Sequence, residues 1–295
     1  MTGVGGPRLI DVEHLGRPRA IGAWIVDERI LVDPGPACSL PRLLERLGSW
    51  RPEAIALTHI HLDHAGAAGG LLARSPGAEV WVHERGAPHL VDPSRLVRSA
   101  RRVYGPELER LWGSPEAVAP GAVRIVADGE RRGRLEVART PGHASHHVSY
   151  LDRDSGTAFV GDVAGVRIAP SSAVLAPTVA PDFDPWLWLG SLERIRAWRP
   201  SSLALTHFGR HEDVERQLAA VGGELRELLR IGADEQALLE HVARALAAGA
   251  RPEDVAAYEQ AAQPRTFAAG IARYLQRRPR AGSTKEGVPD GPPRP

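Results

Sequence analysis

The most constraining feature of this sequence is the segment LTHIHLDHAG, residues 57–66, which directly follows the short apolar run AIA. It places His59, His61, Asp63 and His64 within six positions, although the whole chain has only 12 histidines in 295 residues. Neutral imidazole and carboxylate groups are usual nitrogen and oxygen ligands of zinc and similar divalent ions. The segment therefore predicts a metal site at the carboxyl end of a buried strand.

The spacing inside this segment indicates how the ligands are shared. If the strand continues through His59 and His61, the two side chains project from one side and can bind one ion together. Asp63 and His64 lie in the turn that follows and can face a second ion. The alternative is a polar loop of partly exposed histidines, and four ligand-type residues in six positions argue against it.

Three further segments place ligand-type residues at the ends of predicted strands: TPGHASHH, FVGDVAG and ALTHFG. Ligands from strand ends on one edge of a layered sheet converge and build one cleft. With the pattern H-x-H-x-D-H, these motifs resemble the metallo-β-lactamase superfamily over about residues 8–210, and its glyoxalase II-like branch in THIHLDHAG and TPGHASHH. The resemblance implies an α/β fold, a four-layer αβ/βα sandwich, here with a C-terminal helical extension.

The resemblance also implies two divalent metal ions, with zinc expected and iron or manganese as alternatives. The first ion would be held by His59, His61 and His143, the second by Asp63, His64 and His207, with Asp162 bridging the two. Asp33, in LVDPG, matches an aspartate that supports the histidine loop, and His147 is expected in a supporting or structural role. Metal-bound histidines need such orienting partners.

Substrate contacts are harder to predict from the sequence. The segment between Asp162 and His207 contains GVRIAP and APDFDPW and is expected to form one rim of the cleft. The candidate contacts are Arg167, Phe183 and His211. His146 stands where many relatives have glycine or proline, and whether it faces the cleft is left open.

Two divalent ions about 3.5–4 Å apart share a water molecule and lower its pKa towards neutrality. A metal-bridging hydroxide would then attack an activated acyl bond, with a thioester expected and a lactone or another ester as alternatives. The family suggests that Asp63 handles the proton of the leaving group. A mono-iron persulfide dioxygenase is the alternative of another class, because it uses the same fold and a subset of these ligands.

Charge and composition exclude several other classes. The 37 basic and 36 acidic side chains give a net charge of +1, which argues against a nucleic-acid partner. The single cysteine, Cys38, excludes an intrachain disulfide and a cysteine-based zinc cluster. No apolar run approaches the roughly 20 residues of a membrane span, and the N-terminus lacks a secretory apolar region. We therefore expect a cytoplasmic enzyme acting on a small molecule.

Local signals divide the chain into three parts. Residues 1–209 form the predicted catalytic domain, with a hairpin at Asp27–Arg29, a helix capped by Ser39, a second β-block that starts at AVRIVADG, and a helix capped by Asp184. Residues 210–280 read as a helical subdomain that acts as a lid, a homodimer interface or a packed appendage. Residues 281–295, rich in proline and glycine, are expected to be a disordered tail.

Overall fold

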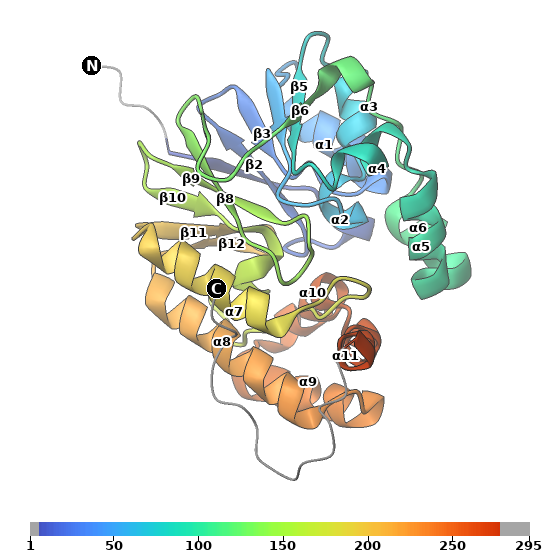
Figure 1. The fold of residues 1–295 in the computed structure, drawn as a ribbon, viewed down its shortest axis with the longest axis vertical. Helices are drawn as coiled ribbons and strands as arrows, with labels where there is room; N and C mark the ends of the chain where they lie inside the picture. The colour runs from blue at the N-terminus through green and yellow to red at the C-terminus, as the bar shows by residue number, and fades with distance from the viewer. Residues whose placement is uncertain (1–5, 278–295) are drawn as a thin grey trace.

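Two six-stranded sheets lie face to face and form the centre of the molecule (Figure 1). The structure is a computed structural model that describes residues 6–277. The first sheet contains, in spatial order, β1 (Arg8–Asp11), β2 (Gly22–Val26), β3 (Ile30–Val32), β4 (Ala54–Ala56), β5 (Glu79–Val82) and β6 (Val123–Ile125). The second contains β12 (Gly209–His211), β11 (Ser202–Leu205), β10 (Thr157–Phe159), β9 (Val148–Asp152), β8 (Leu135–Arg139) and β7 (Arg131–Arg132).

Strand β2 shows why both faces of the sheets are apolar. All five residues of its sequence GAWIV are buried. Trp24 points into the core between the sheets, where its ring lies 6.0 Å from that of Phe159, whereas Ile25 points into the core beneath the helices. A strand covered on both faces reads as a continuous apolar run, because alternate residues face two different cores.

Helices cover the outer face of each sheet and complete four layers. The first sheet is covered by α1 (Leu40–Leu47), α2 (Leu62–Ala65), α3 (Ala68–Leu72), α4 (Ala87–Val91), α5 (Ser94–Tyr104) and α6 (Leu108–Trp112). On the second sheet lie α7 (Pro185–Ala197) and α8 (Val214–Ile231), followed by α9 (Glu235–Gly249), α10 (Pro252–Ala262) and α11 (Phe267–Arg277). This arrangement confirms the predicted αβ/βα sandwich with C-terminal helices.

The structure agrees with the predicted hairpin and with one of the two predicted helix caps. The hairpin between β2 and β3 forms as predicted, with Val26 opposite Ile30. Asp184 caps α7 by accepting hydrogen bonds from the amides of Trp186 and Leu187. The predicted cap at Ser39 is wrong, because a 3-10 turn runs directly into α1 and holds Ser39 in helical backbone geometry, where its side chain makes no capping bond.

The segment AVRIVADG was predicted in the second β-block but forms β6 at the edge of the first sheet. Val123 lies opposite Val80 in a parallel pair. Parallel neighbours need a long crossover, and the helices α4 to α6 between β5 and β6 supply it. The sheet to which a short strand belongs is therefore decided by this connection and not by the strand's own residues.

Two halves of the sandwich repeat one pattern of connections. In the first, a hairpin of β2 and β3 is followed by α1 and the parallel strand β4; in the second, β9 and β10 are followed by α7 and the parallel strand β11. Each parallel strand runs into a Leu-Thr-His sequence, at residues 57–59 and 205–207. The repeat brings the two histidines to the same end of the molecule.

The segment predicted as a helical subdomain, 210–280, shares one apolar core with the second sheet. Its first residues form β12, an edge strand paired with β11, and α8 then packs beside α7 (Figure 1). The predicted tail lies outside the described residues, and the predicted homodimer stays a prediction. Within residues 6–277, every helix is too short or too polar to cross a membrane.

The contact of Tyr258 with the loop before α7 anchors α10. The fully buried hydroxyl group of Tyr258 accepts a hydrogen bond from the Ile168 amide (2.9 Å) and donates one to the Ala173 carbonyl (2.8 Å). We expect Tyr258→Phe to lower the free energy of unfolding by about 1–3 kcal/mol in urea denaturation, because two buried backbone groups lose a partner. Leu275→Ala, at a side chain 46% exposed, should change it by less than about 0.5 kcal/mol. Equal stabilities for the two variants would contradict this anchoring role.

Candidate metal centre

The predicted ligands come from four separate segments that meet at one end of the two sheets. His59, His61 and the short helix α2 follow β4, and His143 lies in the loop between β8 and β9. Asp162 follows β10 and His207 follows β11. The strand β4 ends at Ala56, so His59 and His61 lie in a loop and not on an extended strand as expected.

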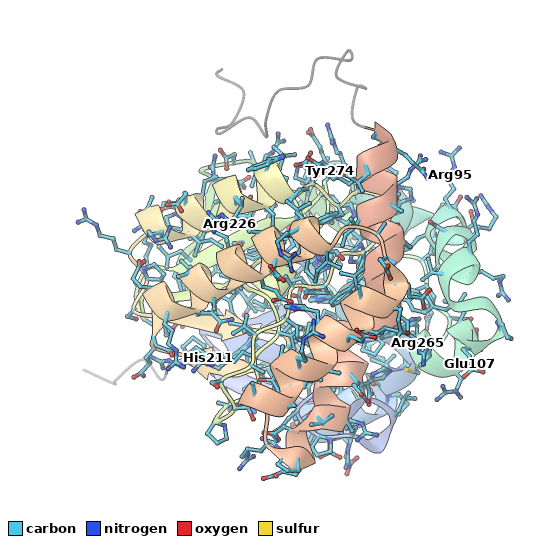
Figure 2. The ribbon with its side chains drawn as sticks, turned by 90° about the horizontal axis from the view of Figure 1, so that it is seen from below. Arg95, Glu107, His211, Arg226, Arg265 and Tyr274 are labelled. Atoms are coloured by element: carbon cyan, nitrogen blue, oxygen red, sulfur yellow. The ribbon has the colours of Figure 1, made fainter. Side chains whose placement is uncertain are left out.

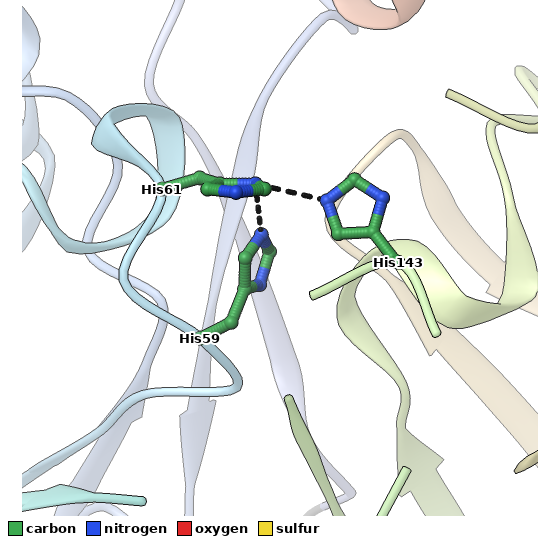
Figure 3. A group of neighbouring side chains, drawn as sticks. All are labelled: His59, His61 and His143. Atoms are coloured by element: carbon green, nitrogen blue, oxygen red, sulfur yellow. Dashed lines mark hydrogen bonds between the residues drawn. The ribbon is translucent and has the colours of Figure 1, made fainter. Parts of the chain in front are cut away.

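Three of the imidazoles converge despite this difference (Figure 3). Nδ1 of His61 lies 2.9 Å from Nε2 of His59 and 2.9 Å from Nε2 of His143. Nδ1 of His143 lies 2.9 Å from the Pro177 carbonyl oxygen, which can only accept, so this nitrogen carries the proton. The neutral ring then directs the lone pair of Nε2 towards the other two histidines, as a metal ligand does.

A second group contains Asp63, His64 and His207. Oδ2 of Asp63 lies 3.4 Å from Nε2 of His207 and 3.9 Å from Nε2 of His64. The other ring nitrogen of each histidine donates to an oxygen: His207 Nδ1 to the Ala20 carbonyl (2.7 Å) and His64 Nδ1 to the Asp33 carboxylate (2.8 Å). Both Nε2 atoms are therefore available as ligands.

Asp162 lies between the two groups. Its Oδ2 is 3.3 Å from Nε2 of His143, and its Oδ1 is 3.0 Å from Nε2 of His64 and 3.4 Å from Nε2 of His207. The backbone before it turns through Gly161, which has a φ of +45°, and a Cβ there would lie 2.5 Å from Thr58 Oγ1. Only glycine allows this approach, which brings one carboxylate oxygen to each group.

Buried atoms without partners test whether the site fits a metal. Nε2 of His64, Nε2 of His207 and Oδ1 of Asp162 are all buried, and none has a partner in hydrogen-bonding geometry. An unsatisfied buried polar group costs about 1–3 kcal/mol, so native proteins rarely retain several in one place. A cation between them would satisfy all three at once. The residues present therefore fit bound divalent ions.

The pKa values agree with this interpretation. Burial and the neighbouring imidazoles hold the pKa of His59 well below its usual value, and burial together with His143 lowers that of His61 to about 4. These rings are neutral at pH 7 and have free lone pairs. Burial also disfavours the charged form of His64, but the carboxylates of Asp162, Asp33 and Asp63 outweigh it and raise its pKa. The same negative charge attracts a metal cation.

Asp33 holds the segments that carry the ligands through hydrogen bonds, as the sequence predicted. It follows β3 with a left-handed φ of 48°, and its buried carboxylate accepts hydrogen bonds from the amide (2.8 Å) and hydroxyl (2.7 Å) of Thr58. It also accepts from Thr206 (3.1 Å) and from His64 (2.8 Å). One carboxylate thus orients a ligand directly and fixes both Thr-His sequences.

His147 lies behind the first group and not in the cleft. Its ring is fully buried and stacked on His59 at 5.0 Å, and its Nδ1 lies 2.8 Å from Thr140 Oγ1. His146 points the other way and lines the cavity beside His61. Burial lowers the pKa of His146 to about 3, so its ring is neutral at pH 7. The position that the sequence left open therefore faces the cleft.

A cavity of about 280 Å³ opens onto the ligand cluster. His61, Asp63 and Asp162 line its inner end, and residues 180–182 of the predicted rim segment line one side. The remaining wall was not predicted, because it comes from α5, α6 and the end of α10, segments with no ligand-type motif. Its residues include Leu96, Tyr104, Trp112, Ala261, Ala262 and Gln263.

The structure does not bring Arg167, Phe183 and His211 to this cavity. The Arg167 guanidinium pairs with Asp213 at 2.8 Å, and His211 Nε2 lies 3.2 Å from the Arg167 carbonyl oxygen. Phe183 is fully buried against Trp188, with ring centroids 6.1 Å apart. Each side chain is satisfied inside the second half of the sandwich, so the expectation that these residues contact substrate is corrected.

The support from Asp33 can be tested through metal affinity. In Asp33→Asn the new amide group would present N–H donors where His64 and the two threonines already donate, so His64 would lose its orientation. We expect zinc affinity, measured by competition with a chromophoric chelator, to fall about 10–100-fold. Asp128→Asn, at a surface carboxylate paired with Arg194, should leave it unchanged. Wild-type affinity in Asp33→Asn would show that this carboxylate does not orient the ligands.

Comparisons with known proteins agree with the geometry. The model of a family described as the metallo-beta-lactamase superfamily matches residues 18–207. A hydroxyacylglutathione hydrolase of Enterobacter sp. is 32% identical over 143 residues, 47% of this chain and 45% of that enzyme. The chain thus matches less than half the length of that relative.

A second relative covers more of the chain. The metallo-beta-lactamase fold-containing protein ST1585 of Sulfurisphaera tokodaii is 30% identical over 190 residues, 61% of this chain and 68% of that protein. The alignment with a crystal structure of ST1585 covers 90% of this chain and 98% of the ST1585 chain, with a TM-score of 0.64 and 23% identity. A metallo-beta-lactamase family protein of Thermus thermophilus gives a TM-score of 0.59 at 20% identity, over 92% of this chain and 93% of that one. The fold, the ligand cluster and the family model agree, and the chain belongs to the metallo-beta-lactamase superfamily.

Proposed function

We propose that the protein is a hydrolase that uses two divalent metal ions, zinc by preference, to cleave activated acyl bonds, and thioesters first. The observation that carries this proposal is the position of Asp162, which presents one oxygen to each of two ligand groups at the end of a cavity. The hydroxyacylglutathione hydrolase relatives support a thioester over other acyl compounds.

The residues of the site would have two roles: they would hold the ions, and one of them would transfer a proton. His59, His61 and His143 would hold one ion, Asp63, His64 and His207 the other, and Asp162 both. When bound, such ions supply an activated water and a Lewis acid for the acyl carbonyl. The carboxylate of Asp63 lines the cavity, and although burial opposes its ionisation, the His64 and His207 rings lower its pKa to about 2. It is therefore ionised at pH 7, as a metal ligand must be, and its position in the cavity wall is the reason to expect that it passes a proton to the leaving group.

The cavity supports a small-molecule substrate, because a half-open site of about 280 Å³ meets the ligands. Lactones and other esters need the same ligands and remain alternatives within this proposal. A mono-iron persulfide dioxygenase needs only one occupied site. The second group has two nitrogen lone pairs and a carboxylate of its own, which favours two ions.

We expect about two zinc ions per chain by elemental analysis of protein never exposed to chelator, and hydrolysis of acyl thioesters followed by thiol release. His61→Ala and Asp162→Ala should each lower kcat by at least about 100-fold, because each removes a metal ligand. Asp154→Ala, at an exposed carboxylate in a surface turn, should keep the wild-type rate. Circular dichroism of each variant controls for folding.

One iron per chain, together with oxygen uptake in the presence of a persulfide, would overturn the hydrolase proposal. Full turnover by the metal-loaded His61→Ala and Asp162→Ala variants would refute the assignment of the ligands. Cleavage of lactones but not of thioesters would keep the site and change the substrate.

A further inference from the structure

We propose that the cavity beside the metal centre binds an apolar, uncharged acyl group, so that the substrates are thioesters or esters of hydrophobic acids. This inference rests on the proposed acyl hydrolysis and adds the class of acyl group. It is carried by the composition of the cavity walls, by the contacts that hold them in place, and by the scarcity of charge between them.

The walls beyond the ligands are largely apolar, and their uncharged polar groups belong to His89, Ser99, Tyr104, His146 and Gln263. The walls come from α5 and α6, from the loop before α7, and from the end of α10, which lie far apart in the sequence. The apolar lining residues are Leu62, Leu96, Ala100, Val103, Trp112, Pro177, Val179, Ala180, Pro181, Ala261 and Ala262. Small residues on α10 face larger ones on α5 and α6, which leaves a slot that leads to the ligand cluster.

A buried histidine holds the two halves of this wall together. His14 stacks on Trp112 of α6, with ring centroids 5.1 Å apart, and its Nε2 donates to the Leu111 carbonyl (2.6 Å). The side-chain amide of Gln260, on α10, lies 2.8 Å from both His14 Nδ1 and the His14 carbonyl oxygen. The wall is therefore formed in advance, so little of the binding free energy is spent on ordering it.

Charged groups are few along this slot. Among the described lining residues Arg95 is the one cation; it lies on α5 and is labelled in Figure 2. Asp182 is the one carboxylate apart from the ligands, and it accepts a hydrogen bond from Ser145. An acyl group that carried a carboxylate or a phosphate would enter apolar surface with a single arginine to pair it, which is unfavourable.

His146 is the polar lining residue nearest to the ligand His61 for which the structure indicates a free hydrogen-bonding group. Its side chain is 9% exposed and lines the cavity beside His61, and its Nδ1 is buried with no partner among the described residues. A proton on Nδ1 would be buried unpaired, which favours the tautomer protonated at Nε2. An N–H donor at this position can bind a carbonyl or amide oxygen of an uncharged acyl compound.

A chain-length series tests the proposal on the zinc-loaded full chain. Thioesters of one thiol, N-acetylcysteamine, would be compared from acetyl to octanoyl, with the lactoyl thioester as the polar reference. Each buried methylene contributes about 0.8 kcal/mol, so kcat/KM should rise about fourfold per methylene until the slot is filled. A flat or falling series, or a preference for lactoyl over butanoyl, would overturn the proposal.

Two matched variants locate the effect. Val103 lines the slot yet is 42% exposed, so Val103→Asp adds a charge to the wall without burying it in the core. We expect this variant to lower the ratio of octanoyl to acetyl kcat/KM by at least about tenfold. Leu187→Asp, at a side chain 53% exposed on α7 and outside the slot, should keep the wild-type ratio. An unchanged ratio in Val103→Asp would place the acyl group elsewhere.

Binding without cleavage separates this inference from the proposed reaction. The octyl thioether of N-acetylcysteamine cannot be hydrolysed. Calorimetry on the zinc-loaded chain should show it binding between about 100-fold and a few thousandfold more tightly than the ethyl thioether, depending on how many of the added methylenes the slot holds. Equal affinities would refute the apolar slot even if thioesters were cleaved. Tight octyl binding without cleavage of any thioester would support the slot and refute the proposed reaction.

Discussion

The hydrogen bonds to the Asp33 carboxylate are the interaction on which the metal centre depends. Asp33 follows β3 of the first sheet and binds Thr58 on the neighbouring strand's extension, Thr206 from the second sheet, and the ring of His64. A buried carboxylate is stable only when such donors surround it. Its charge is thus compensated by the same groups that carry the ligands, so the ends of both sheets and the metal centre are fixed together.

Two backbone hydrogen bonds also join the segments at the ends of the two sheets. The Gly22 amide, at the start of β2, donates to the Thr206 carbonyl (2.9 Å), and the Val148 amide, at the start of β9, donates to the Thr58 carbonyl (2.8 Å). Each half of the sandwich therefore donates a backbone hydrogen bond to the Thr-His sequence of the other half. The ligands that follow, His59 and His207, are buried and held in place before any ion binds, which limits reorganisation on binding.

The C-terminal helices form part of the cavity wall, whereas the predicted ligands come from other parts of the fold. Tyr258 and Phe267 of this segment pack in the core of the second half, and Ala261 and Ala262, at the end of α10, line the cavity. The ligands lie in loops at strand ends, whereas the wall lies on helices held by His14 and Gln260. Changes in the helices can therefore alter the shape of the cavity without moving the ligand cluster.

The sequence by itself indicated the ligand set, through four short motifs and the family resemblance that they carry. It also indicated the position of Asp33, the hairpin at residue 27 and the cap of α7, because each of these depends on residues close together in the chain. Only the tertiary structure decided that β6 joins the first sheet, that Arg167, Phe183 and His211 are buried away from the cavity, and that α10 forms its wall. These outcomes depend on which segments from different parts of the chain pack against one another. Burial and packing between distant segments carry no local motif, so the ligand motifs could be read from the sequence and the shape of the cavity could not.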